Sequence, residues 1–322
     1  HLYLGESIDG GVTVHWGDGE TTTLSGTSSA LYDHTYAAPG DYEIAIEVTS
    51  GTLQLEANST YSLFGKSNSY GDNRCNATRI RRVALGANVT SLGAYILYNC
   101  TGLESISIPR EVSIGNNAFC SCSALRYLTV PAGSTQLGDS AFQNCVGLTH
   151  LSFPDGITGF GSNSLNGCKN LVRLAVPDTV TSISNNAIQG CDSLRRAALS
   201  QRLTSIGSNT LMNCISLNEL AIPNGVASLP NSFLTQCTGM TRVTVPESVT
   251  SIGSNALAYL YSLGELRMLS ATPPTLSSPH NIQSNTGLVI YVPYSSDHSV
   301  LAAYQAASVW SSFASRMQEA PE

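Results

Sequence analysis

The residues of this chain that could do chemistry include nine cysteines, because thiols can form disulfides, bind zinc or act as nucleophiles. Seven of the nine recur at nearly equal intervals, at Cys100, Cys122, Cys145, Cys168, Cys191, Cys214 and Cys237. The first interval is 22 residues and the other five are 23 residues. Catalytic residues do not repeat in this way. The spacing therefore indicates one structural position that is used again in successive coils of a repeat.

The cysteine position is predicted to be apolar and buried. In the coil that follows Cys237, the equivalent residue is Leu260. Because a buried thiol behaves as a small hydrophobic group, we favour a stacked column of unpaired cysteines. Neighbouring coils of a solenoid lie ~4.8 Å apart, which is within disulfide reach, so a bonded column stays open as the alternative. Cys75 and Cys120 lie outside the column, and no C-x-x-C pair with histidine partners indicates zinc.

Other catalytic patterns are absent from the sequence. The six histidines are scattered, at His1, His15, His34, His150, His280 and His298. None lies in an H-E-x-x-H or G-x-S-x-G motif, and the glycine-bearing segments lack the strand-to-helix context of a phosphate loop. No strand presents a convincing pair of carboxylates for glycoside hydrolysis. We therefore predict a protein that is not an enzyme, with no cofactor and no metal site.

The elements that position these residues follow from the repeat, which reads C-x-x-L-x-x-L-x-V-P-x-x-V-T-S-I-G-x-x-A-F/L-x-x. The last apolar residues of L-x-x-L-x-V-P alternate as in a strand, and the proline, which lacks an N–H group, ends that strand. V-T-S-I-G can cover the opposite side of the same core, and A-F/L-x-x-C then returns inward. One coil is too small to bury its apolar face alone. The pattern predicts a mainly β fold, a solenoid of coils of about 23 residues.

A column of residues on the predicted strands faces outward. In successive coils the residue before the second apolar position is Arg82, Ser105, Tyr127, His150, Arg173, Arg196, Glu219, Arg242 and Glu265. Nine of the 13 arginines fall within these strand segments, at positions 79, 81, 82, 126, 173, 195, 196, 242 and 267. Guanidinium groups pair well with carboxylate and sulfate, and arginine and tyrosine dominate interface hot spots. We therefore predict a binding face for an anionic or carboxylate-bearing partner, made of Tyr127, His150, Arg173, Arg196 and Arg242.

A structural role for the same arginines stays open. They could pair with nearby acids such as Glu219 and Glu265, or lie over strand residues and so oppose aggregation of the sheet. Another coil has Ala197, Leu199 and Ser200 where Leu, Val and Pro are expected. We interpret that departure as a tolerated local weakness rather than a site.

The repeated prolines, S-I-G triplets and cysteines resemble the BspA-like leucine-rich repeats of surface proteins from anaerobic bacteria, which also occur in some protozoan parasites. The resemblance extends from about Ile80 to Met268. It implies a secreted or surface-attached binding protein, since several members of the family are adhesins. It does not imply an enzyme.

Both ends of the chain differ from the middle. Near the N-terminus, V-T-V-H-W-G-D-G at 12–19, H-T-Y at 34–36 and P-G-D-Y at 39–42 resemble the PKD-like immunoglobulin-type fold, a small β-sandwich. Asp18 is expected to cap its own turn. Calcium is the alternative, although no series of acids at calcium-loop spacing supports it.

The C-terminal end is predicted to close the solenoid. Residues 287–293 have the pattern of a last strand, and residues 300–317 place apolar side chains at helical spacing. These apolar residues are Leu301, Tyr304, Ala307, Trp310, Phe313 and Met317. Similar endings close many BspA-like arrays, and we interpret Tyr304 and Trp310 as core residues rather than a sugar platform. The predicted divisions are a PKD-like domain at 1–55, the solenoid at 56–270 and a cap of strand plus helix at 271–322.

Composition suits an exported protein. The chain has 22 acidic and 15 basic residues, and its net charge of −7 argues against a general nucleic-acid binder. No segment approaches the ~18 consecutive apolar residues of a membrane span. The chain starts at His1 without a methionine, so we expect a mature or trimmed form whose export signal or lipid anchor lay upstream.

These observations predict an extracellular or bacterial cell-surface protein, a monomer that binds a protein or glycan in the manner of an adhesin. Host extracellular matrix and mucin are the expected kinds of partner. The alternative is a structural spacer of the cell envelope without a ligand of its own. Six intervals of ~4.8 Å give only about 29 Å of rise, which is short for a spacer and modestly favours binding.

Overall fold

The computed structural model describes residues 2–4, 7–9, 11–25, 30–32, 34–35, 37–38, 43–49, 52–55, 61–62, 65–66, 80–277, 282 and 287–321. Cys75, Arg79 and the P-G-D-Y motif lie outside these residues. The chain divides into two compact units, each described here by itself. Unit 1 comprises residues 1–157 and 163–169, and unit 2 comprises residues 158–162 and 170–322.

Unit 1 joins antiparallel strands to parallel coils within the same sheets. A five-stranded sheet has the order β12 (Ser105–Ser107), β10 (Arg82–Leu85), β6 (Glu43–Val48), β3 (Gly11–His15) and β4 (Thr21–Ser25). A four-stranded sheet has the order β13 (Ser113–Ile114), β11 (Val89–Leu92), β7 (Thr52–Leu55) and β2 (Ser7–Asp9). Pairing becomes parallel where β6 meets β10 and where β7 meets β11. The N-terminal strands thus continue into the first coils, and the PKD-like character of this region stays a prediction.

Within the described residues, unit 1 also contains three two-stranded sheets, and unit 2 begins with a three-stranded sheet. In unit 1, the remaining pairs are β14 (Tyr127–Thr129) with β15 (His150–Ser152), β1 (Leu2–Leu4) with β5 (Ala30–Tyr32), and β8 (Tyr61–Ser62) with β9 (Gly65–Lys66). In unit 2, one three-stranded sheet contains β16 (Gly159–Phe160), β18 (Ser182–Ile183) and β20 (Ser205–Ile206).

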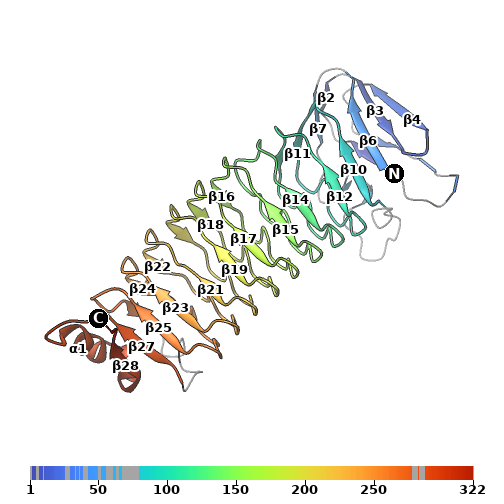
Figure 1. The fold of residues 1–322 in the computed structure, drawn as a ribbon. Coiled ribbons are helices and arrows are strands. Elements are labelled where there is room, and N and C mark those ends of the chain that lie inside the picture. The colour runs from blue at the N-terminus through green and yellow to red at the C-terminus, as the bar shows by residue number, and fades with distance from the viewer. Residues whose placement is uncertain are drawn as a thin grey trace. The chain divides into compact units, whose positions relative to one another are not determined.

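Unit 2 is parallel throughout its paired strands. A second three-stranded sheet contains β17 (Arg173–Ala175), β19 (Arg196–Ala198) and β21 (Glu219–Leu220). A third contains β22 (Ser228–Leu229), β24 (Ser251–Ile252) and β26 (Thr275–Leu276). A four-stranded sheet contains β23 (Arg242–Val245), β25 (Glu265–Met268), β27 (Val289–Val292) and β28 (Met317–Glu319). In each unit, equivalent strands of successive coils lie side by side in register (Figure 1), which confirms the predicted solenoid.

The returning turns of each coil are also held by hydrogen bonds between coils. In unit 1, the Leu97 amide donates to the Ala118 carbonyl at 2.8 Å, and the Phe119 amide donates to the Ala141 carbonyl at 2.8 Å. The side chains of Ala118, Phe119 and Cys122 are fully buried, as the repeat predicts. The Phe119 and Phe142 rings stack with centroids 5.2 Å apart. Backbone hydrogen bonds therefore join neighbouring coils both in the strands and in the turns, around a buried core.

The turns require left-handed backbone at two positions of the coil, which explains why asparagine recurs there. One position lies five residues before the column position, at Tyr95, Asn117, Ser140, Asn163, Asn186, Asn209, Ser232 and Asn255. The other directly precedes the column position, at Asn99, Ser121, Asn144, Gly167, Gly190, Asn213, Gln236 and Tyr259. Asparagine and glycine tolerate positive φ better than most residues do. Sequence reasoning did not assign this role to them.

The cysteine column is buried, and five of its members are free thiols that hydrogen-bond to backbone. Sγ of Cys122, Cys145, Cys168, Cys214 and Cys237 donates to the carbonyl oxygens of Leu97, Phe119, Phe142, Ile188 and Leu211, at 3.1–3.2 Å. Burial raises the pKa of Cys168 to about 12, because the interior disfavours a thiolate. The predicted unpaired column is confirmed for these five residues.

The C-terminal cap has the predicted strand and helix, and the helical part is interrupted once within the predicted span. Helix α1 runs from Ser299 to Ala306, a 3-10 helix follows from Trp310 to Arg316, and Met317 begins β28. Val309 has a φ of 68°, which interrupts the helix between these two parts. Tyr304 and Trp310 are core residues, as predicted. The Tyr304 hydroxyl donates to the Ser270 carbonyl at 2.9 Å, and Trp310 Nε1 donates to the Pro274 carbonyl at 2.7 Å.

Candidate binding face

The strands place the predicted binding residues on the outer face by simple alternation. In unit 1, Leu128 and Leu151 are buried, and their neighbours Tyr127 and His150 are exposed. Tyr127 is in register with His150, and 60% of its surface is exposed. The hydroxyl of Thr149 lies 3.0 Å from Nδ1 of His150. The structure therefore brings these two predicted residues together on adjacent strands.

In unit 2, the structure places two arginines on adjacent strands. Arg173 of β17 is in register with Arg196 of β19, and both side chains are exposed. Neighbouring strands are ~4.8 Å apart, so two like charges face the same solvent at close range. On its other side, Arg196 is in register with an acidic residue, Glu219. An anionic ligand would offset the repulsion between the arginines.

Arg242, the last predicted residue, belongs to an ionic cluster. Its Nε and Nη2 each lie 2.9 Å from Oε2 of Glu265, the residue in register on β25. Arg267 donates to the other carboxylate oxygen, and its guanidinium carbon lies 5.3 Å from the centroid of the Tyr291 ring. The sequence left open a structural role for the arginines, in which they pair with nearby acids. Arg242 makes such a pair with Glu265.

The charge state of Glu265 follows from this cluster. Partial desolvation raises the pKa of its carboxyl group, but hydrogen bonds and positive charge from Arg267 and Arg242 outweigh that effect and hold the pKa below its ordinary value. Two cations share one anion, so the cluster carries a net positive charge. Glu265 remains an acceptor and never a donor at neutral pH.

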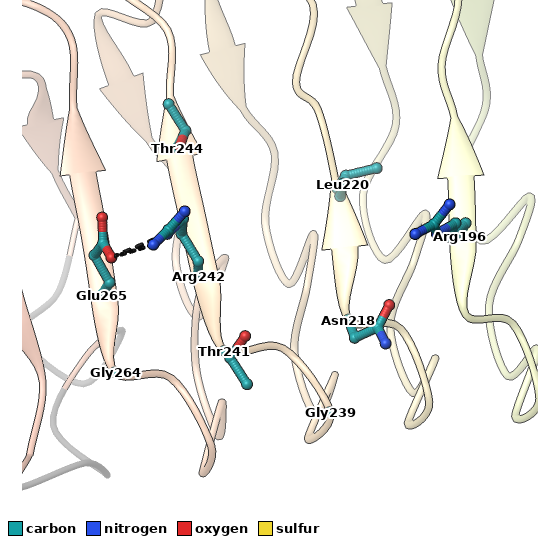
Figure 2. Close-up of a pocket in the computed structure, with 9 residues that line it drawn as sticks. All are labelled: Arg196, Asn218, Leu220, Gly239, Thr241, Arg242, Thr244, Gly264 and Glu265. Atoms are coloured by element: carbon teal, nitrogen blue, oxygen red, sulfur yellow. Dashed lines mark hydrogen bonds and ion pairs between the residues drawn. The ribbon is translucent and has the colours of Figure 1, made fainter.

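A groove opens on the outer face between Arg196 and Arg242. It has a cavity volume of about 900 Å³ and is lined by Arg196, Asn218, Leu220, Gly239, Thr241, Arg242, Thr244, Gly264 and Glu265. The groove lies where the ladder is interrupted, because β21 ends one sheet and β23 begins the next. Figure 2 shows Arg196 on one side of Asn218 and Leu220 and Arg242 on the other, with Arg242 turned toward Glu265.

Sequence reasoning missed part of this face. It followed one outward position per strand, although the residue two places further along points to the same side. That second position holds Thr244 on β23, Arg267 on β25 and Tyr291 on β27. Strand alternation alone could have identified these residues. Nothing in the sequence indicates that Asn218, Thr241 and the glycines line a groove, because the groove depends on the interruption of strand pairing between β21 and β23.

The N-terminal motif forms a small polar cluster in unit 1. Oδ1 of Asp18 accepts a hydrogen bond from the Glu20 amide at 3.0 Å, so the predicted turn cap is confirmed. Oδ2 of Asp18 lies 2.7 Å from Nε2 of His34, and the His34 ring stacks on Trp16 with centroids 4.7 Å apart. Trp16 Nε1 donates to the Thr22 hydroxyl at 2.8 Å. These contacts account for both carboxylate oxygens of Asp18 and give the motif a structural role.

Two other kinds of feature, a metal-binding cluster and a membrane-spanning helix, are absent from the described residues. Within them, no group of three or more histidine, cysteine, aspartate or glutamate side chains is arranged to hold a metal ion. The helices in the described part of the chain are too short or too polar to cross a membrane.

Comparison with known proteins identifies the family. The BspA type leucine-rich repeat region matches residues 72–172 and 161–273, in six copies. This match spans more than half of the chain. The chain therefore belongs to the BspA-type leucine-rich repeat family. Membership favours a non-enzymatic repeat protein that acts by binding.

Solved structures of leucine-rich repeat proteins are similar to this chain. A leucine-rich repeat protein from Bacteroides ovatus is 18% identical with a TM-score of 0.54, over 82% of this chain and 86% of that chain. A leucine-rich cell surface protein from Faecalibacterium prausnitzii is 18% identical with a TM-score of 0.38, over 81% and 93% of the two chains. At such identities the first match shows the fold alone. No curated protein matches the chain.

Proposed function

We propose that this protein is a non-enzymatic binding protein of the bacterial cell surface, adhesin-like, whose strand face contacts a protein or glycan. The observation that carries the proposal is the charge of that face in unit 2. Strands β17, β19, β21, β23 and β25 contain four arginines and two glutamates, a net charge of +2. The whole chain has a net charge of −7. A basic surface on an acidic protein favours anionic partners.

The exposure of the face supports the same proposal. Tyr127 is 60% exposed, and the side chain of Arg242 is 62% exposed. Packing does not select an exposed tyrosine or two adjacent arginines, whereas interfaces are enriched in both residue types. Surface location is supported by membership of the BspA-type family.

Binding of the purified chain to immobilised matrix proteins, mucin and sulfated or sialylated glycans tests the proposal. The measurement compares the native chain with an Arg173→Glu/Arg196→Glu variant at low and near-physiological salt. We expect binding that persists at physiological salt and falls at least tenfold in the variant, because two attractive charges become repulsive.

A matched control separates the strand face from net charge. Arg110→Glu/Arg202→Glu makes the same change in net charge at two exposed arginines outside the strands. This control is expected to bind as the native chain does. Equal loss in both double variants, or unchanged binding in the strand-face variant, would contradict the proposal. Absence of binding to the whole panel would favour an envelope spacer.

A further inference from the structure

We propose that the groove between Arg196 and Arg242 binds a sugar residue that carries one carboxylate, either a uronic or a sialic acid, within an oligosaccharide. This inference rests on the proposed binding function and assigns it a ligand class and a location. The groove lies wholly within unit 2 and spans strands β19, β21, β23 and β25. Its volume of about 900 Å³ falls within the range of small-ligand sites.

The chemistry of the lining argues for a ligand with one negative charge and several hydroxyl groups. Arg196 and Arg242 supply guanidinium donors that match a carboxylate. Asn218, Thr241 and Thr244 both donate and accept hydrogen bonds, as a sugar hydroxyl also does. In addition, the glycines at 239 and 264 carry no side chain that would cover their backbone groups.

Glu265 argues against a densely anionic ligand. It lines the same groove as the two arginines, and its carboxylate is held between Arg242 and Arg267. Sulfate or carboxylate groups on every unit of a polymer would bring some of their charge close to this anion. A single carboxylate can contact the Arg196 side of the groove, while hydroxyl groups of the same ligand donate to Glu265.

Peptide ligands fit the groove less well. Peptide anchors are usually aromatic or aliphatic side chains in apolar pockets. Leu220 supplies the single apolar side chain of the lining, apart from the aliphatic parts of its polar residues. One such side chain suits the less polar face of a sugar ring.

Calorimetric titration of the purified chain with three soluble sugars tests the inference. The probes are sialyl-lactose, a disaccharide that contains glucuronic acid, and neutral lactose. We expect at least one of the two carboxylated sugars to bind, and lactose to bind at least tenfold more weakly, since it lacks the charge-assisted hydrogen bonds. The two acidic probes distinguish the sialic acid from the uronic acid.

Two single variants locate the site. Arg196→Gln removes the charge on one side of the groove and should weaken binding of the acidic sugar at least tenfold. Arg202→Gln removes the same charge at an exposed arginine outside the strands and outside the lining, and should change binding less than twofold. The unfolding midpoint of both variants should equal that of the native chain, because both side chains are exposed.

Several results would overturn the inference. They are lack of binding to both acidic sugars, equal binding of lactose, equal loss in the two single variants, or tighter binding of an acidic peptide than of either sugar. If the immobilised panel still shows binding that needs Arg173 and Arg196, the strand-face proposal survives and the sugar assignment alone fails.

Discussion

The interior cysteine column and the outward column on the strands have the same spacing, but the residue type is constant in the first and varies in the second. Cysteine occupies the interior position in seven successive coils. The outward position changes from Tyr127 to His150, Arg173 and Arg242 over the same coils. An interior side chain must fill the same closed space each time, so packing restricts the residue type. An outward side chain has no such restriction, and its identity is free to match what the surface contacts.

The largest effect that we predict for the interior column concerns the reactivity of its thiols. Desolvation raises the pKa of Cys168 from 9.0 to about 12, so its thiolate fraction at pH 8 is about a thousandfold below that of an ordinary thiol. We expect Cys168 and Cys145 to resist maleimide in the folded chain and to react within minutes in denaturant. Mass spectrometry of each cysteine-containing peptide measures the difference. Rapid labelling of Cys168 in the folded chain would contradict the buried column.

Removal of an interior aromatic ring should cost far more than removal of an outward one. Phe142 is fully buried and stacks on Phe119, so Phe142→Ala should lower the free energy of unfolding by about 3–5 kcal/mol. Tyr127→Ala removes an exposed ring in the same unit and should change it by less than about 0.5 kcal/mol. Urea titration measures both variants. Similar losses would show that the outward column also supports the fold.

Two glycines at the same position in successive coils, Gly133 and Gly156, differ in how closely the neighbouring coil approaches them. Both lie two residues after a coil proline, but a Cβ at Gly133 would lie 2.1 Å from the Glu111 carbonyl oxygen, whereas one at Gly156 would lie 3.8 Å from its nearest neighbour. Gly133→Ala should therefore destabilise the chain by about 1–3 kcal/mol through overpacking.

Gly156→Ala is the control for this prediction and should be nearly neutral, since its Cβ meets only an ordinary contact. The thermal unfolding midpoints of the two variants measure the difference. If the two midpoints coincide, the close approach of neighbouring coils at Gly133 is not as described.

The ionic cluster on the outward side should have the smallest effect on stability. The pKa of Glu265 is lowered from 4.5, so its stabilising contribution is complete above that value and is lost as the pH falls through the lower folded value. At pH 7, Glu265→Gln should cost less than about 1 kcal/mol, because the arginines are exposed. The difference between native and variant chains should be constant from pH 7 to 5.5 and become smaller as the pH falls below 4.5. Urea titrations across this range would detect a different course.

Much of the fold could be predicted because each coil repeats the same local pattern. Alternation of apolar residues identified the strands, and the cysteine that is replaced by Leu260 identified a buried position. The break of the last helix could not be predicted, because apolar spacing continues through Val309, a β-branched residue that rarely adopts positive φ. The recurring asparagines at the two turn positions are a sequence signal for left-handed backbone, which the sequence analysis did not use.

The candidate site was predicted only in part. Period and alternation identify which residues face outward, and Glu265 was correctly named as a possible partner for an arginine. The groove depends on where strand pairing stops between β21 and β23, which no local pattern reports. Arg267 and Tyr291 come together across two coils, and only the register of the folded strands reveals that contact.

The most direct test of the account replaces the outward column while leaving the interior untouched. The variant carries Tyr127→Ala, His150→Ala, Arg173→Ala, Arg196→Ala and Arg242→Ala. Its free energy of unfolding and its binding to the immobilised panel are measured on the same preparation. The account predicts a folded chain, within about 1 kcal/mol of the native stability, that has lost binding. An unfolded variant, or a folded one that binds as the native chain does, would contradict the separation of fold from function.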